Sequence, residues 1–454
     1  MPTFDVLKYG ARGDGVTPDT AAIQRAINDA SAAGKGAQVL IRGGRRYLIG
    51  SLELRGGIDF HLADDAELVA SSRREDYGGS EVAPYGGQYS TLISAAEAHG
   101  LRISGTGRIN GRSKEFMDHY DKQDEWWRPK EWRARIIVVT SSKDVEVRDI
   151  RIEDTPEWAL HLLGCEGVLV EGLGIRNDME IPNSDGIDAD HCQGVEIRKC
   201  NIVCGDDAIS VKTTVQKREY GACGNIRAAD CVLETQDSGV KIGTHCHQDI
   251  CKVRFERCEI KSSSRGIAIQ MRDEGNVSDI EFRDIKLVSR YYSNPWWGRG
   301  EAISLTAHPR TPQMKMGSLR SVRVANVTGR AENSVRVSGS KECRIRDVTL
   351  EDVAITLDRW TRYPGGVFDN RPTEGRYPEI EPHGTPGFHI RSADNVVLKR
   401  CRVAWGENRP EYFTHALETD DATGLEISGF VGEAAHPERD SAMAFDPRPS
   451  RASR

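Results

Sequence analysis

Residues 194–202 have the sequence GVEIRKCNI, two short runs in which apolar and polar side chains alternate. Alternation with a period of two, branched apolar residues and intervening Gly, Asn or Asp are typical of short β-strands joined by turns. The pattern returns every roughly 23–31 residues, with further copies starting at Asp144, Gly167, Asn225, Lys252 and Asp279. One repeat cannot bury its own apolar face, so successive copies must stack as a solenoid. The sequence therefore predicts an all-β fold, a right-handed parallel β-helix.

The two ends of the repeat region differ from its middle. Residues 19–33 carry a helical apolar stripe after the capping residue Asp19. We expect this helix to cover the open end of the solenoid and its exposed strand edges. From residue 436 onward the chain is rich in Pro, Arg and Ser, which predicts a flexible tail. Because repeats run through most of the 454 residues, we predict a single domain over residues 1–435.

Composition and charge argue against several classes of protein. The net charge of −7 is unfavourable for binding nucleic acid, and no apolar run is long enough to cross a membrane. The first residues lack the apolar core of a signal peptide. We therefore expect a cytoplasmic protein, or a secreted one if a signal has been removed. No cofactor is predicted, and the sequence does not indicate an oligomeric state.

Carboxylates gather in two successive copies of the repeat. Residues 183–188 have the sequence NSDGID, and residues 205–212 have the sequence GDDAISVK. Asp is a poor strand former, and crowding like charges costs free energy unless a function or a cation compensates for it. Glycosidic hydrolysis uses such groups, one to protonate the leaving oxygen and one to activate water. We predict catalytic roles for Asp185, Asp206 and Asp207; the alternative is that they bind turn backbone or a cation.

The 11 cysteines, an odd number in a long chain, do not predict a disulfide framework. Four of them begin the second run of a repeat and are expected to be small buried hydrophobic residues: Cys200, Cys231, Cys258 and Cys401. The rival interpretation is a metal site at residues 245–247 (HCH) with Cys251, but the paired cysteine spacing of zinc sites is absent. No metal is predicted.

Several cations and aromatic residues are candidates for sugar binding. Aromatic rings in loops beside a cleft can stack on sugar faces, and both residues 126–127 and residues 296–297 are Trp-Trp pairs that we expect in loops. Residues 360–386 interrupt the repeat and are expected to form a loop that walls a binding cleft. The candidates on the chain are Lys212, Lys241, Arg272, Trp296 and Trp297.

Residues 155–161 (TPEWALH), the NSDGID run and the GDD run follow one another in an order that resembles the polygalacturonase family, glycoside hydrolase family 28. The similarity covers roughly residues 3–430. The resemblance implies a pectin-lyase-like solenoid and inverting hydrolysis. It makes Asp206 the general acid, while Asp185 and Asp207 position and deprotonate water. Asn183, in the first motif, is expected to bind substrate.

Two motifs of that family are altered. Asp237 stands where the family has the His of Gly-His-Gly, and Ala268 and Gln270 stand where it has the Arg and Lys of Arg-Ile-Lys. Strand alternation predicts that Ala268 and Gln270 face outward. Neither can replace the paired, charged donors that hold a carboxylate. We keep Asp237, Gln270 and Lys241 as candidates for sugar binding, and we expect polygalacturonate to be a poor substrate.

The predicted function is therefore a glycoside hydrolase that acts on a pectin-related or other oligosaccharide or polysaccharide. Two alternatives stay open. One is a polysaccharide lyase or epimerase on the same solenoid, which would bind calcium through its acidic residues and use Lys241 or Arg272 as a base. The other is a glycan-binding β-helix without activity.

Overall fold

The computed structural model describes residues 2–79, 81–82, 88–375 and 377–445. Contacts between Cα atoms divide the chain into two compact units. The N-terminal unit comprises Met1–Ile209, Gln216–Gly221 and Asn225–Val232; the C-terminal unit comprises Ser210–Val215, Ala222–Gly224 and Leu233–Arg454. The expectation of one domain over residues 1–435 stays a prediction.

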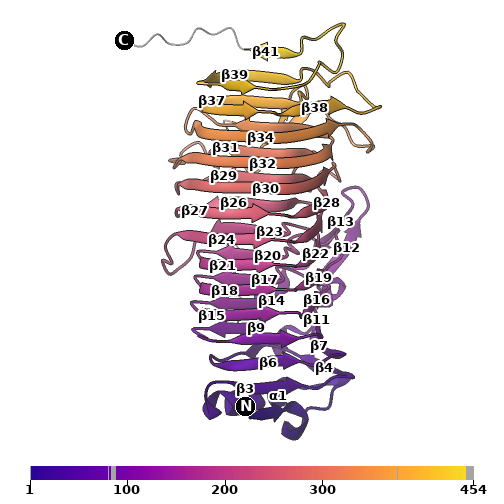
Figure 1. The fold of residues 1–454 in the computed structure, drawn as a ribbon. Helices are drawn as coiled ribbons and strands as arrows, with labels where there is room; N and C mark the ends of the chain where they lie inside the picture. Colours follow the sequence, from indigo (N-terminus) through magenta and orange to yellow (C-terminus); the bar gives the residue numbers. More distant parts are fainter. Residues whose placement is uncertain (1, 80, 83–87, 376, 446–454) are drawn as a thin grey trace. The chain divides into compact units, whose positions relative to one another are not determined.

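The N-terminal unit is built from three parallel ladders of strands, seen as successive rungs in Figure 1. The first joins β1 (Thr3–Asp5), β3 (Ala37–Ile41), β6 (Ile58–Leu62), β10 (Arg102–Gly105), β15 (Lys143–Arg148), β18 (Glu166–Glu171) and β21 (Gln193–Arg198). The second joins β2 (Asp14–Pro18), β4 (Arg45–Ile49), β7 (Ala66–Ala70), β11 (Arg108–Asn110), β16 (Arg151–Glu153), β19 (Gly174–Arg176) and β22 (Asn201–Cys204). The third joins β5 (Leu52–Glu53), β9 (Gln88–Ala96), β14 (Trp132–Thr140), β17 (Leu160–Leu163) and β20 (Ile187–Asp190).

The repeats seen in the sequence lie in register in these ladders. Val145, Val168 and Val195 are partners on successive strands of the first ladder, and each is almost completely buried. The turn between the first and second ladders takes a left-handed backbone at Asp149 (φ 62°), Gly172 (φ 69°) and Lys199 (φ 54°). Gly, Asn and Asp tolerate that conformation best, which explains why they recur between the runs.

The helix α1 (Thr20–Ala33) confirms the prediction of a helix over residues 19–33. Its apolar stripe is buried and lies against β1, β3, β5 and β6, the first strands of the N-terminal unit. Asp19 does not cap the helix with its side chain; it accepts hydrogen bonds from the backbone N–H groups of Arg12 and Gly13 instead, at 2.6 and 3.0 Å.

The C-terminal unit repeats the same architecture with longer strands. One ladder joins β26 (Ser238–Cys246), β29 (Arg265–Met271), β31 (Glu301–Ala307), β33 (Asn333–Ser338), β37 (Phe388–Lys399), β39 (Leu417–Thr423) and β41 (Met443–Phe445). Another joins β27 (Ile250–Glu256), β30 (Val277–Ser289), β32 (Leu319–Ala331) and β34 (Ile345–Leu357), which continues into β37 and β38 (Arg402–Trp405). Shorter strands are β28 (Glu259–Ser263) and β40 (Glu426–Ser428).

The cysteines, the first Trp pair and the C-terminal tail were each given a local structure by the sequence. The four cysteines at the repeat corners are buried, and none of the 11 cysteines, all within the described residues, forms a disulfide. The pair Trp126–Trp127 does not lie in a loop, which corrects that expectation: both belong to β13 (Trp126–Pro129), an antiparallel partner of β12 (Met117–Asp121). Part of the expected flexible tail is a strand, since β41 pairs with β39; residues 446–454 lie outside the described residues.

Candidate active site

The three predicted catalytic carboxylates lie together in the N-terminal unit. One oxygen of each of Asp185, Asp206 and Asp207 lies within 4.8 Å of the others. Asp185 lies two residues before β20, and the other two follow β22. Asp185 and Asp207 are buried, with 2% and 3% of their surface exposed, whereas Asp206 is half-buried. Asp206 is therefore the most accessible of the three to a bound molecule.

Two glycines let the two motifs stack closely enough to bring these groups together. A Cβ on Gly186 would lie 2.3 Å from the carbonyl oxygen of Ala208, and a Cβ on Gly205 would lie 2.3 Å from that of Ile181. The Gly186 N–H donates to the Asp207 carbonyl at 2.9 Å, and the Gly205 N–H donates to the Ser184 hydroxyl at 2.9 Å. The glycines thus fix the spacing of the carboxylates through backbone contact.

Asn183 contacts Asp206, the predicted general acid. Its backbone N–H donates to Asp206 Oδ2 at 3.2 Å, its amide nitrogen lies 3.5 Å from the same oxygen, and its φ is 56°. The Asp207 N–H donates to the other oxygen, Oδ1, at 2.9 Å. Asn183 was predicted to bind substrate; the structure also gives it a role in orienting Asp206.

Arg133, which sequence reasoning missed, holds Asn183 in turn. Its guanidinium donates to Asn183 Oδ1 at 2.9 Å and to the carbonyl oxygens of Pro156 and Pro182 at 3.1 and 2.8 Å. Burial lowers the pKa of Arg133, against the opposite influence of Glu157, Asp185 and Asp206. The signal that could have revealed it is the presence of two charged residues, Arg133 and Arg135, inside the mostly apolar strand run of residues 132–140.

A second buried network lies behind the TPEWALH motif. Arg135 pairs with Glu157 at 3.0 Å, and its guanidinium is stacked 3.8 Å from the ring of Tyr89 and 3.8 Å from that of Trp158. His161 lies 3.2 Å from Arg135 through Nδ1 and 3.2 Å from Asp190 through Nε2. Burial lowers the pKa of His161, so this ring is neutral at physiological pH. The network holds the backbone of the TPEWALH motif in place and does not provide a solvent-accessible acid or base.

The predicted sugar-binding residues Asp237 and Lys241 lie in the C-terminal unit, Asp237 immediately before β26 and Lys241 within it. The Lys241 ammonium lies 4.0 Å from the Asp237 carboxylate and 5.6 Å from the centre of the Trp297 ring. Both charged side chains are almost completely buried. Trp297 is half-buried, whereas Trp296 and Lys212 (in β23, Ile209–Thr213) are buried, which leaves little of either surface for a ligand.

Gln270 and Arg272 do not face an open cleft, which corrects the expectation for both. Only 1% of Gln270 and none of Arg272 is exposed. The Gln270 amide donates to the Arg371 carbonyl at 3.0 Å, and Arg272 donates to the Asn370 carbonyl at 3.1 Å. Burial and the neighbouring arginines lower the pKa of Arg272 to about 9. Strand alternation gave the correct outward face of β29, but residues 369–371 cover it.

The covering segment belongs to the interruption at residues 360–386. It contains an antiparallel pair, β35 (Val367–Asp369) and β36 (Ile380–Pro382). Asp369 is fully buried and lies 2.6 Å from Arg371, 3.2 Å from Arg299 and 3.6 Å from Arg265. Burial alone would raise the pKa of Asp369, but Arg371, Arg265 and Arg299 hold it well below its usual range. A charged carboxylate therefore anchors the segment to the ladder.

Substituting Asp369 with Asn should destabilise the protein by about 3–5 kcal/mol, because it leaves three buried guanidinium groups without their shared anion. Urea unfolding at pH 7 followed by circular dichroism measures this free energy. A surface substitution, Asp352→Asn, which removes an exposed ion pair with Arg400, is the matched control and should change stability little. The wild-type contribution is present above about pH 4 and is lost as the pH falls, since the folded pKa is lowered. The difference between variant and wild type should therefore shrink in acid; a difference at pH 7 no larger than that of the control would contradict the anchoring role.

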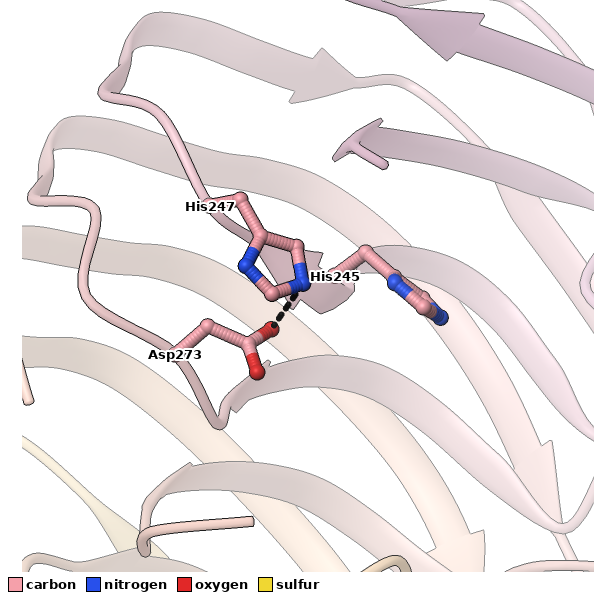
Figure 2. A group of neighbouring side chains, drawn as sticks. All are labelled: His245, His247 and Asp273. Atoms are coloured by element: carbon pink, nitrogen blue, oxygen red, sulfur yellow. Dashed lines mark ion pairs between the residues drawn. The ribbon is translucent and has the colours of Figure 1, made fainter. Parts of the chain in front are cut away.

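The contacts of Asp273 argue against the alternative of a metal site at residues 245–247. Figure 2 shows the His247 ring turned toward Asp273, with Nε2 and the carboxylate 3.6 Å apart. Both oxygens of Asp273 already accept hydrogen bonds from Arg310, at 2.8 and 3.0 Å, so a fixed cation occupies the place of a metal ion. Burial and Arg310 lower the pKa of His245 to about 3. Cys246 is buried in the core, and Cys251 lies on the next strand, β27.

In the part of the chain that the structure describes, no helix is both long and apolar enough to cross a membrane.

The model of the family "Glycosyl hydrolases family 28" matches residues 79–363, and the model "Rhamnogalacturonase A/epimerase, pectate lyase-like" matches residues 3–59. A probable polygalacturonase of Vitis vinifera is 28% identical over 308 residues, which cover 62% of this chain and 60% of that protein. The chain thus spans less than two thirds of the length of that relative.

Solved structures share the fold. A family 28 exopolygalacturonase of Yersinia enterocolitica has a TM-score of 0.68 at 16% identity, covering 93% of this chain and 78% of that one. An exopolygalacturonase of Thermotoga maritima has a TM-score of 0.67 at 18% identity, covering 87% of this chain and 91% of that one. These likenesses confirm the predicted fold class, a right-handed parallel β-helix. Because the family model matches residues 79–363, which are more than half of this chain, the chain belongs to glycosyl hydrolases family 28.

Proposed function

We propose that the protein hydrolyses an O-glycosidic bond of a pectin-related oligosaccharide or polysaccharide, with Asp206 as general acid and with Asp185 and Asp207 positioning and deprotonating water. The observation that supports this proposal is the group of three carboxylates whose oxygens lie within 4.8 Å of one another. A general acid must deliver a proton to the leaving oxygen. Asp206 is the best placed to deliver it, because it is the most exposed of the three.

The stereochemical outcome needs a separate test. Inverting glycosidases usually hold their two carboxyl groups about 6.5–9.5 Å apart to leave room for water, and retaining enzymes about 5–5.5 Å apart. Here one oxygen of each of the three carboxylates lies within 4.8 Å of the others. The expectation of inversion rests on the family resemblance. In an inverting reaction at this site, the attacking water would approach the three carboxylates from their open side instead of lying between them.

One assay tests both parts of the proposal. The purified protein is incubated with pectic, rhamnogalacturonan and neutral oligosaccharides; new reducing ends are measured, and proton NMR identifies the first anomer released. We expect turnover of at least one substrate with inversion. Retention would overturn the inverting assignment. An unsaturated product that absorbs ultraviolet light and requires calcium would identify a lyase, and tight binding without turnover would identify a glycan-binding protein.

Candidate roles in substrate binding remain with Asn183 and Trp297, which are partly exposed, and with the buried pair Asp237 and Lys241, because the Lys241 ammonium lies 5.6 Å from the Trp297 ring. The structure weakens the case for Gln270, Arg272, Lys212 and Trp296, whose side chains are buried. The proposal needs no cofactor.

A further inference from the structure

A second group of histidines with a carboxylate lies in the C-terminal unit. His383, His389 and Glu418 each offer one ligand atom, and these atoms lie within 4.8 Å of one another. His389 in β37 and Glu418 in β39 are direct partners in the ladder, so their side chains leave the same face of neighbouring strands. His383 follows β36 and comes from the segment that covers the ladder. Two imidazoles and one carboxylate are a ligand set typical of zinc.

Hydrogen bonding prepares His383 to bind a cation. Its Nδ1 lies 2.6 Å from the Gly384 carbonyl oxygen, to which it must donate, so in the neutral ring Nε2 carries the lone pair. That Nε2 lies 3.3 Å from Glu418 Oε1. Burial would lower the pKa of His383, but Glu418 and the Gly384 carbonyl raise it. The positive charge that this contact needs is therefore a second proton on Nε2 or a metal ion that takes the place of that proton. Histidines that bind metals usually donate their other N–H group to a carbonyl or carboxylate in this manner.

The separation fits a tetrahedral ion. Zinc binds histidine and carboxylate at about 2.0–2.2 Å, which places two ligand atoms of a tetrahedron about 3.4 Å apart. The His383–Glu418 separation of 3.3 Å matches this value. The other separations are at most 4.8 Å, so rotation of a side chain would complete the set. The side chains of His383 and Glu418 are 24% and 23% exposed, which gives an ion a route of entry and leaves room for water as a fourth ligand.

His389 supplies an independent indication. Only 1% of its surface is exposed, and within the described residues its Nδ1 is buried without a hydrogen-bond partner. Leaving a buried polar atom unsatisfied costs about 1–3 kcal/mol. A metal ion in this cluster would hold the ring in a defined position and offset part of that cost.

Nearby charges leave Glu418 available. Arg391 pairs with Glu381 at 2.6 Å and with Asp420 at 3.4 Å, and Arg336 lies 3.7 Å from Glu381. Among the described residues, the ion pair that Glu418 makes is with His383. This distinguishes the cluster from the one in Figure 2, where Arg310 binds both oxygens of Asp273.

We propose that His383, His389 and Glu418 form a zinc site that ties the segment after β36 to β37 and β39. The ion has a structural role: it holds in place the segment that covers the ladder, and it takes no part in glycosidic cleavage. Because an ion that binds only the folded state stabilises it by mass action, zinc should raise the melting temperature.

The test uses the full-length chain without a histidine tag, stripped with a chelator and titrated with zinc chloride by calorimetry at pH 7.5. Bound metal is counted by mass spectrometry after dialysis. We expect zinc binding and a higher melting temperature in the wild type, and at least tenfold weaker binding in Glu418→Gln and His383→Ala. The control His247→Ala, in the other histidine cluster, should bind zinc as the wild type does.

Circular dichroism in the absence of metal checks that each variant folds. If Glu418→Gln does not fold, His383→Ala, which changes a partly exposed side chain, tests the site in its place. Cobalt in place of zinc should give the absorption of a tetrahedral centre in the wild type and not in the variants. Absence of zinc binding by the wild type, unchanged binding in both cluster variants, or equal loss in His247→Ala would overturn the proposal. Glycosidic activity is measured separately, so its failure would not decide the metal site.

Discussion

Substituting Asp206 with Asn should lower kcat by about 10²–10⁴-fold on whichever substrate the protein cleaves, because an amide cannot deliver the proton that the leaving oxygen needs. The variant should fold normally. Asn has nearly the same shape as Asp, and its single oxygen can still accept from one of the two backbone N–H groups that now hold the carboxylate, those of Asn183 and Asp207 at 3.2 and 2.9 Å. Initial rates from reducing ends, with kcat separated from KM, measure the effect.

The matched control is Asp144→Asn, an exposed residue of the same unit with a left-handed backbone (φ 54°) that Asn also tolerates. Its kcat should equal that of the wild type. A near-normal kcat in Asp206→Asn would end the assignment of Asp206 as general acid, and the lyase and binding alternatives would then have to be considered first.

The second large effect concerns substrate choice: kcat/KM on unbranched polygalacturonate should be lower by about 10²–10⁴-fold than on the preferred substrate. The family resemblance implies two cations that grip the galacturonate carboxylate, each contact worth about 1.5–3 kcal/mol. Here Ala268 has no exposed surface, and the Gln270 amide donates to the Arg371 carbonyl. Asp237 adds a negative charge in place of the family's histidine.

Neither of the cations closest to these positions restores the grip. Arg371 donates to Asp369 and to the carbonyl oxygens of Asn294 and Trp296, and the Lys241 ammonium is 4.0 Å from Asp237. We therefore expect the preferred substrate to carry a neutral sugar at this subsite, or an acid group placed to meet Lys241.

Comparing polygalacturonate with oligosaccharides that differ in the sugar at one position measures this preference. Lys241→Met, tested on acidic and neutral substrates, shows whether Lys241 meets an acid group: the variant should lose efficiency on the acidic substrate only. Rapid hydrolysis of polygalacturonate by the wild type would contradict the predicted specificity.

The fold and the carboxylates could be predicted because both depend on local patterns. Val145, Val168 and Val195 recur at a regular spacing, and parallel stacking then places them in one column. The same stacking brings Asp185 beside Asp206, since the two motifs occupy adjacent repeats. The repeat period and the order of the motifs along the chain are enough to predict these two features.

The environment of Gln270 and Arg272 could not be predicted in this way. Alternation of apolar and polar residues predicts which face of a strand a side chain leaves. Ion pairs between residues far apart in the sequence determine which segment covers that face. Arg265 and Asp369 are 104 positions apart, and no local pattern connects them. Arg133 was missed for the same reason, because its partners come from two separate turns that meet only after folding.

The interruption between β34 and β37 leaves the ladder undisturbed. Val348 still faces Val396 and Leu350 still faces Leu398, although the chain between Leu357 and Phe388 departs from the repeat and carries β35 and β36. Selection can therefore lengthen, replace or recombine this insert without altering the register of the strands that support it. Exchanging residues 358–387 between family members is accordingly a route to engineered variants with new substrate preferences on an unchanged scaffold, provided that the buried arginines receive a matching acid.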